Sequence, residues 1–183
     1  NTRRKLNDYD LKDYGRKITL FAEWCNEMGM PISFHHHMGT AIETEHDVDR
    51  LMSQSGEAVK LLYDTGHMAF SGGNVLSMIE KHSNRISHVH AKDVRLEVIN
   101  KLDRNTESFL DAVLKGAFTV PGDGSLNFDE IILRLADSGY EGWFVVEAEQ
   151  DPSLAPPFKY ACMGQKTLVK ALRNAGYDIE DNL

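Results

Sequence analysis

The hydrophobic residues of this chain follow two different spacings along its length. Between residues 9 and 28, apolar side chains recur every three or four positions, as they do on one face of an α-helix. They are Leu11, Tyr14, Ile18, Phe21, Cys25 and Met28, and Gly29 follows as a helix-ending glycine. We therefore expect a helix over residues 9–28, with its aromatic positions, including Phe21, packed in the core.

Four short apolar runs follow, and each has the length and composition of a buried β-strand. They span residues 32–35, 59–63, 86–90 and 143–147. Helical patterns follow them, at about 45–55, 75–82, 108–114, 127–138 and 157–175. Thr44 with Asp47, Asn74, and Asn127 with Glu130 are of the types that cap helix N-termini. Strands alternating with helices predict an α/β fold with a parallel sheet and right-handed crossovers.

Composition narrows the class of protein. The 183 residues, 42% of them hydrophobic, suit a single domain over 1–183 with a substantial core. A net charge of −8 argues against a nucleic-acid partner, and no apolar run approaches the ~20 residues of a membrane span. Cys25 and Cys162 are too few for a disulfide framework, so we expect a reducing, cytoplasmic compartment. Residues 1–5 are polar, without an initiator Met or signal peptide, as inside a longer gene product.

A residue that can bind a metal stands at the end of every predicted strand. The four residues are His35, Asp64, His90 and Glu147. The carboxyl ends of parallel strands carry the ligands and active sites of α/β folds. Mixed nitrogen and oxygen ligands suit Mn²⁺ or Co²⁺ first, with Fe²⁺ or Zn²⁺ also compatible. The joint pattern predicts a divalent-metal site, although each residue alone has an ordinary alternative.

Those alternatives are structural. Asp64 also suits a helix cap, His90 a buried core histidine, and Glu147 an ion pair with Lys92. Further candidates for substrate contact lie beside the four strand ends: His37, His67, His88, Lys92, Asp93 and Glu149. We place His67 on a loop after Asp64. His46 and His82 fall on predicted helices and are expected at the surface, whereas Phe128 is expected in the core.

Several motifs carry a resemblance to a known family. They are HHHMGT at 35–40, DTGH at 64–67, HVHAKDVR at 88–95, VPGDG at 120–124 and EAEQDP at 147–152. In order and spacing they resemble the inosose dehydratases, in the inositol-catabolism branch of the xylose isomerase-like TIM barrels. The resemblance runs over almost the whole chain. It implies a (β/α)₈ barrel of which this chain is the C-terminal half, with residues 9–28 as the fourth helix and the strands as the fifth to eighth.

The resemblance also implies an activity and its residues. The expected enzyme is a metal-dependent lyase that dehydrates 2-keto-myo-inositol to a dione, with the metal on His35, Asp64, His90 and Glu147. Glu147, or its neighbour Glu149, would remove the α-proton. His35, His37 or His67 would protonate the leaving hydroxyl. Contacts to the substrate would come from His37, His67, Lys92, Arg95, Asp123 and Glu149.

Other functions remain open at this level. Related sugar epimerases and isomerases share the expected fold and metal, but they usually carry a carboxylate where His35 stands. This difference favours dehydration over epimerisation. An endonuclease-IV-like enzyme is disfavoured by the negative charge and by the absence of a multi-zinc ligand set. A self-associating fragment without activity is the remaining alternative, and an active enzyme is also compatible with a homo-oligomer.

Overall fold

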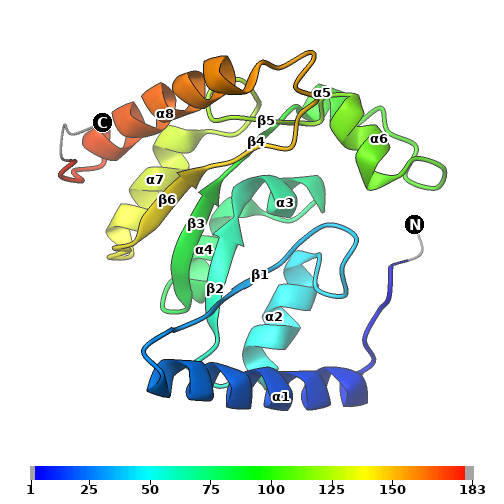
Figure 1. The fold of residues 1–183 in the computed structure, drawn as a ribbon, viewed down its shortest axis with the longest axis vertical. Helices are drawn as coiled ribbons and strands as arrows, with labels where there is room; N and C mark the ends of the chain where they lie inside the picture. Colours follow the sequence, from blue (N-terminus) through cyan, green and yellow to red (C-terminus); the bar gives the residue numbers. More distant parts are fainter. Residues whose placement is uncertain (1–2, 180–183) are drawn as a thin grey trace.

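The chain builds a parallel four-stranded sheet in the order β1-β2-β3-β6 (Figure 1). The computed structural model describes residues 3–179. The strands are β1 (Ser33–His35), β2 (Lys60–Asp64), β3 (Ile86–Ala91) and β6 (Trp143–Val146). All three strand pairings are parallel, which confirms the predicted α/β fold, and β1 and β6 form the two edges.

Five longer helices flank this sheet. They are α1 (Asp8–Glu27), α2 (Glu45–Gln54), α4 (Val75–His82), α7 (Phe128–Asp137) and α8 (Pro157–Asn174). Helices α4 and α7 lie behind the sheet in Figure 1, α1 packs on α2, and α8 packs on α7 and β6. The sheet face that carries Leu62 and His88 is turned away from α4 and α7, and both side chains are half-buried. No helix between residues 3 and 179 has the length and apolarity needed to cross a bilayer.

Local sequence explains where these helices begin. The Thr44 hydroxyl accepts a hydrogen bond from the Asp47 amide, and the Asp47 carboxylate accepts from the Thr44 amide, so the predicted capping box is present. The Asn74 side chain likewise caps α4, and the Asn127 side chain accepts from the Glu130 amide at the start of α7. These three predicted caps are confirmed.

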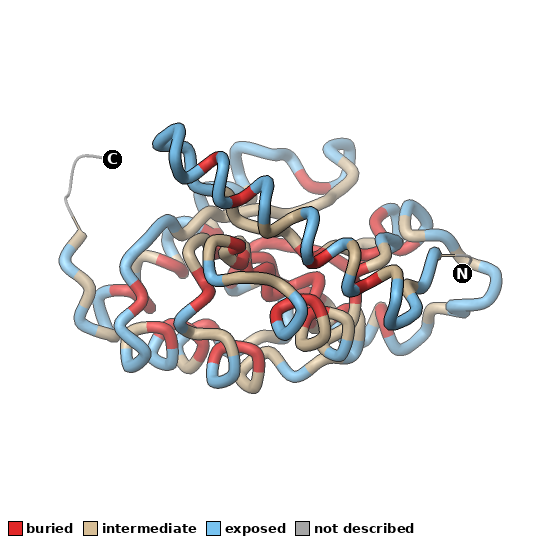
Figure 2. The backbone as a smooth tube through the Cα atoms, turned by 90° about the horizontal axis from the view of Figure 1, so that it is seen from below, coloured by how far each residue is buried: buried red, intermediate tan, exposed pale blue. Residues whose placement is uncertain are grey.

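The core lies between the sheet and the helices, where Figure 2 shows buried segments along the middle of the molecule. Leu61, Val89 and Ile132 are fully or almost fully buried there, and Phe128 is buried as predicted. A second, smaller core surrounds Phe118 beneath the loops that follow β2 and β3. It supports the end of the sheet where the candidate ligands lie.

The predicted inner face of α1 was correct for Leu11 and Cys25, which are buried, but wrong for its aromatic positions. Tyr14 and Phe21 are exposed, the latter by 53%, whereas Gly15 and Ala22 are buried. A Cβ atom on Gly15 would lie 2.3 Å from the carbonyl oxygen of Gln54, at the end of α2. The close contact of the two helix backbones therefore turns the small residues, and not the aromatic ones, toward the neighbouring helix.

Four short elements were not expected from the sequence: one helix after β2, two short strands and one helix after β3. Residues after Asp64 form helix α3 (Thr65–Phe70), so His67 lies on a helix and not on a loop. After β3, a two-residue strand β4 (Asp93–Val94) pairs antiparallel with β5 (Phe118–Thr119). Helix α5 (Leu96–Ile99) follows β4, and α6 (Phe109–Leu114) confirms the predicted helical segment near Ser108. Elements of two to six residues carry too little periodicity for a sequence pattern to reveal them.

The two helical histidines differ in exposure. His46 is exposed on α2, as predicted. His82 is half-buried at the end of α4, where its Nε2 lies 2.7 Å from the Asp49 carboxylate, so its assignment to the surface was wrong. This contact between α2 and α4 holds the side chain inward. Cys25 is buried and Cys162 exposed, and both are free thiols.

Candidate metal centre

Three of the predicted ligands converge at the carboxyl end of the sheet. His35 ends β1, Asp64 ends β2, and His90 lies opposite Asp64 in the register of β3. The Nε2 atom of His35 and the Nδ1 atom of His90 each lie 3.4 Å from Oδ2 of Asp64. Parallel pairing therefore places two imidazoles around one buried carboxylate oxygen, as the sequence predicted for these three residues.

The donor atoms of this triad fit a divalent cation. All three atoms are buried and make no hydrogen bond with any residue between 3 and 179. Buried polar atoms without a partner are costly and rare in proteins. Two ligands about 2.1 Å from a common ion lie about 3.4 Å apart at a tetrahedral angle, which agrees with both separations in the triad. Nitrogen and carboxylate donors in this arrangement have the chemistry of a Mn²⁺, Co²⁺, Fe²⁺ or Zn²⁺ site.

Glu147, the fourth predicted ligand, lies beside the triad. It follows β6, and its amide hydrogen-bonds to the Ala91 carbonyl of β3 at 3.4 Å. Its Oε2 atom lies 3.7 Å from Nδ1 of His90 and 2.5 Å from the Lys92 ammonium. The ligand interpretation of Glu147 and its ion pair with Lys92 are therefore both compatible with the geometry.

Asp64 has two roles, one for each oxygen. Its Oδ1 accepts a hydrogen bond from the His67 amide at 2.8 Å and caps α3, while Oδ2 faces the imidazoles. The structural alternative for Asp64, a helix cap, is thus correct together with its place in the triad. Burial raises the pKa of the Asp64 carboxyl, but His35, His90 and Lys92 outweigh burial and hold this pKa well below its usual range. The carboxylate is ionised at neutral pH.

A second cluster lies next to the triad. His37, His67 and Glu149 present ligand atoms that all lie within 4.8 Å of one another. The Oε1 atom of Glu149 is 3.4 Å from Nε2 of His37 and 3.5 Å from Nε2 of His67, and the two imidazole rings are 3.8 Å apart. The sequence named these three residues as substrate contacts, but it did not show that they form a compact group.

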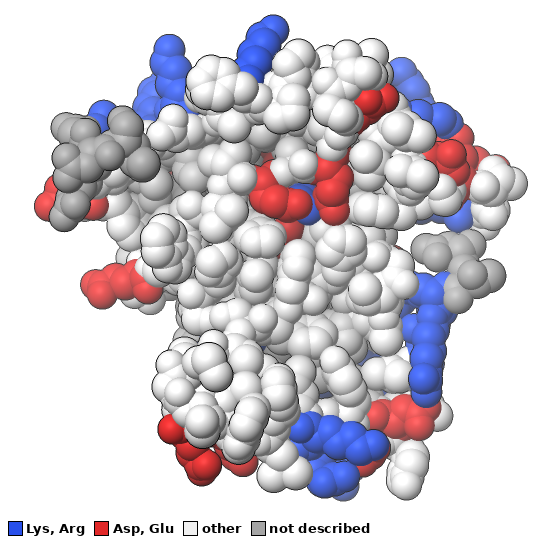
Figure 3. Space-filling model, viewed as in Figure 1, with Lys and Arg blue, Asp and Glu red and all other residues white. Residues whose placement is uncertain are grey.

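The two clusters meet at Lys92, which is completely buried. Its ammonium lies within 3.3 Å of Asp64 Oδ2 and contacts carboxylates of Glu147 and Glu149. In Figure 3, acidic side chains are grouped beside a basic one near the middle of the face, and uncharged residues surround this group. Burial lowers the pKa of Lys92, but the surrounding carboxylates outweigh it and the pKa is raised overall.

The histidines next to the triad differ in their hydrogen bonds. In His37, Nδ1 lies 2.9 Å from the Met38 carbonyl and Nε2 faces Glu149, so both nitrogens face acceptors. The hydrogen bond with Glu149 raises the pKa of His37. In His67, Nε2 lies 2.9 Å from the Lys92 ammonium and accepts from it, and burial lowers the pKa. His37 is therefore the better proton donor of the two.

His36 has a structural role. It points to the opposite side of β1 from its neighbours, as the alternation of a strand predicts, and it is fully buried. Its Nε2 accepts a hydrogen bond from the Asp64 amide at 3.2 Å. Burial lowers the pKa of His36 to about 3, so the ring stays neutral while it orients the end of β2.

Two further predicted residues form a network of their own. Arg95 pairs with the Asp123 carboxylate and donates to the Gly116 carbonyl, while the Thr119 hydroxyl donates to Asp123 at 2.6 Å. Asp93 was proposed for substrate contact, yet it is buried and accepts hydrogen bonds from the amides of Gly122, Gly124 and Leu126. It thereby shapes the turn after β5 that carries Asp123.

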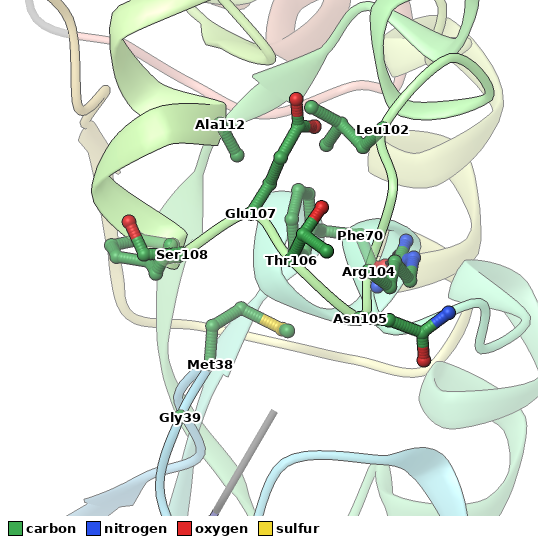
Figure 4. Close-up of a pocket in the computed structure, with 11 residues that line it drawn as sticks. Met38, Gly39, Phe70, Leu102, Arg104, Asn105, Thr106, Glu107, Ser108 and Ala112 are labelled. Carbon is green, nitrogen blue, oxygen red and sulfur yellow. Dashed lines mark hydrogen bonds between the residues drawn. The ribbon is translucent and has the colours of Figure 1, made fainter.

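A cavity of about 310 Å³ lies next to the Phe109 ring, and Figure 4 shows the residues that line it. Its floor includes Met38 and Phe70, and the loop at residues 104–108 supplies a polar rim. The Phe109 ring also lines the cavity and lies 5.6 Å from the ring of His37 and 6.0 Å from that of His67. The sequence gave no signal for this cavity, because the connection after α5 has no periodic pattern.

The parallel sheet, the helices around it and the candidate ligands at its carboxyl end are features of one class of fold. The chain belongs to the xylose isomerase-like TIM barrel family, whose model matches residues 2–178. It is 51% identical over 175 residues to the rhizopine catabolism protein MocC of Rhizobium meliloti, an alignment that covers 96% of this chain and 54% of MocC.

Several other relatives are inosose dehydratases. The enzyme of Geobacillus thermodenitrificans is 57% identical over 136 residues, covering 74% of this chain and 46% of the relative. The enzyme of Clostridium beijerinckii is 49% identical over 162 residues, and this alignment covers 88% of this chain and 54% of the relative. These identities confirm the resemblance found in the sequence. The chain spans about half the length of the curated relatives it matches.

Solved structures agree on the fold. The IOLI protein, crystallised with a zinc atom, superposes with a TM-score of 0.71 at 16% identity, over 96% of this chain and 61% of IOLI. A probable 3-DHS dehydratase from Bacillus anthracis, AsbF, gives a TM-score of 0.68 at 16% identity. The superposition covers 90% of this chain and 58% of AsbF. The four parallel strands are thus part of a TIM barrel, as predicted.

Proposed function

We propose that this chain carries the metal centre and acid–base groups of a lyase that dehydrates 2-keto-myo-inositol. The main support for the proposal is the triad of His35, Asp64 and His90. Its buried donor atoms make no hydrogen bond with the described residues, and Glu147 lies beside it. The relatives named inosose dehydratase, at 49–57% identity, support the reaction and the substrate. A histidine at position 35, where related epimerases usually carry a carboxylate, supports dehydration over epimerisation.

The triad, with Glu147 as a fourth ligand, would hold the cation. Mn²⁺ or Co²⁺ suits this ligand set best, and Fe²⁺ or Zn²⁺ is also compatible with it. When bound, the cation would polarise the substrate carbonyl and favour loss of the neighbouring proton. The ketone group of the substrate therefore belongs at the carboxyl end of the sheet, next to Asp64.

Two side chains would move the protons. The Glu147 carboxylate, or Glu149 beside it, takes the proton from the carbon next to the ketone. The hydroxyl on the following carbon leaves with a proton from an imidazole, so that one water is lost and the enol product tautomerises to a dione. His35, His37 and His67 are the candidates for the acid. The hydrogen bonds favour His37, because His67 Nε2 accepts from Lys92 and His35 Nε2 faces Asp64 within the triad.

The remaining ring hydroxyls need polar partners. Glu149, His37 and His67 form the group nearest the triad and would contact the hydroxyls close to the ketone. The pair of Arg95 and Asp123 would serve hydroxyls farther from the ketone. The cavity at Phe109 adjoins the second cluster, which makes it a route of entry for a polyol ring.

The test combines metal analysis with an activity assay. The purified chain should contain about one divalent ion, and dehydration of 2-keto-myo-inositol should stop with chelator and return with Mn²⁺ or Co²⁺. Glu147→Gln should lower the rate about 10²–10⁴-fold, which is the usual contribution of one acid–base group. His46→Gln, which changes an exposed residue on α2, is the matched control and should keep the wild-type rate.

Three outcomes would contradict the proposal. Normal turnover in Glu147→Gln would remove the assigned base. Faster conversion of ketohexoses than of keto-inositol would favour an isomerase or epimerase of the same family. Absence of bound metal, with a fold unchanged by EDTA, would leave only a non-catalytic, self-associating fragment.

A further inference from the structure

The Lys92 ammonium lies at the junction of the two clusters. It is 2.5 Å from Glu147 Oε2 and 2.6 Å from Glu149 Oε2, and it donates to His67 Nε2 at 2.9 Å. Asp64 Oδ2, the central oxygen of the triad, is 3.3 Å away. Three carboxylates and one imidazole therefore surround a single positive charge in a fully buried place.

The same surroundings have the composition of a second metal site. His37, His67 and Glu149 supply two imidazoles and a carboxylate within 4.8 Å of one another, the same donor types as the triad. The two groups are neighbours, because His67 Nε2 lies 3.9 Å from Asp64 Oδ2. Enzymes with paired metal ions hold them on neighbouring groups of ligands, and the two groups here are neighbours of that kind.

Lys92 is held firmly in this position. Its amide donates to the Thr65 hydroxyl at 3.1 Å, and that hydroxyl donates to the Lys92 carbonyl at 2.6 Å. Its aliphatic stem packs on Gly66, where a Cβ atom would lie 2.5 Å from Cγ of Lys92. The ammonium is therefore a fixed feature of the site.

We infer that Lys92 is a built-in cation that takes the place of a second divalent ion and keeps the centre mononuclear. Its charge offsets part of the negative charge of Glu147 and Glu149, and its hydrogen bond occupies the His67 nitrogen that a second ion would need. Without Lys92, the second cluster would have an excess of negative charge and an empty space at its centre. The inference rests on the proposed metal centre in the triad and adds a positioning role for Lys92.

The experiment counts metal ions per chain. The wild type, Lys92→Ala and Lys92→Arg are loaded with excess Mn²⁺ or Co²⁺, desalted and analysed for metal, with circular dichroism to confirm folding. Lys81→Ala is the matched control, because Lys81 also bridges two carboxylates, Glu45 and Asp49, but it is exposed on α4. We expect one ion for the wild type, Lys92→Arg and Lys81→Ala, and two for Lys92→Ala.

A second variant locates the additional ion. Lys92→Ala combined with His37→Ala should return to one ion per chain, because the second cluster loses a donor. Electron paramagnetic resonance of the Mn²⁺-loaded Lys92→Ala should show spin coupling between adjacent ions, and this signature should be absent in the double variant. A stability change alone would produce neither result.

The outcomes separate the inference from the proposed function. Two ions on the wild type would overturn the inference even if Lys92→Ala did not fold. One ion on a folded Lys92→Ala would overturn it as well and leave the mononuclear centre intact. No ion on the wild type would remove the proposed metal centre itself, and the inference with it.

Discussion

Asp64 and His90 face each other across neighbouring parallel strands, and Nδ1 of His90 lies 3.4 Å from Oδ2 of Asp64. The other oxygen of the same carboxylate caps helix α3 through the His67 amide. One side chain thus joins the end of the sheet, the start of a helix and the candidate metal centre. The two roles can be separated by substitution, because an asparagine keeps a capping oxygen but loses the negative charge.

Asp64→Asn should remove metal binding without unfolding the chain. Asn and Asp are equivalent helix caps, whereas a neutral amide is a poor ligand for a divalent ion. We expect the metal affinity to fall by more than the ~10–100-fold typical of residues outside the ligand shell. Isothermal titration with Mn²⁺ measures this change. Addition of Mn²⁺ at about 100 times its dissociation constant should stabilise the wild type by about 2.7 kcal/mol and leave Asp64→Asn unchanged.

His37→Asn should reduce turnover and preserve metal content. His37 lies outside the triad, but its imidazole stands between the Met38 carbonyl and Glu149, in the second cluster. If it donates the proton to the leaving hydroxyl, the rate should fall by about 10²–10⁴. Steady-state kinetics with metal analysis of the same sample would decide the matter. A rate close to that of the exposed control His46→Asn would transfer the acid role to His35 or His67.

Glu45→Gln should make the stability of the fold less dependent on acid pH. Glu45 connects α2 to α4, because it accepts from Lys81 at 2.8 Å and from the Asn74 amide at 2.9 Å. The Lys81 hydrogen bond, followed by that from Asn74, lowers the pKa of Glu45 to about 2. A carboxyl with a depressed pKa stabilises the fold at pH values above its pKa in the unfolded chain, which is about 4.3 for Glu. This stabilisation is lost as the pH falls toward about 2.

Urea unfolding between pH 7 and pH 2 measures that contribution. The wild type should exceed Glu45→Gln in stability at pH 7, and the difference should vanish near pH 2. Glu23→Gln is the control, since Glu23 is exposed on α1 and outside every ion pair found between residues 3 and 179. A difference between wild type and Glu45→Gln that persisted at pH 2 would contradict the electrostatic explanation.

Gly15→Ala should destabilise the packing of α1 on α2. The added Cβ would lie 2.3 Å from the Gln54 carbonyl oxygen, a backbone atom that cannot rotate away. Overpacking of this kind costs about 1–3 kcal/mol, although alanine has the higher helix propensity. Phe21→Ala, on the exposed side of the same helix, should change the stability by less than about 0.5 kcal/mol. Thermal unfolding of both variants would test the corrected orientation of α1.

The hydrophobic pattern of the sequence determined the order of strands and helices, and the residue types at their ends determined the caps. Because parallel strands present their carboxyl ends on one side, it also determined that His35, Asp64 and His90 would meet. Such features depend on neighbours a few residues apart or on the alternation within one strand.

Tertiary structure alone decided the rest. The orientation of α1 depends on how closely Gly15 approaches α2, and the helix after Asp64 depends on a cap that also serves the triad. The sequence placed Lys92 near the site but not at its centre, because its position follows from carboxylates more than fifty residues away, Glu147 and Glu149. Contacts between distant segments form only when the sheet assembles, so the pattern of residues within one segment does not predict them.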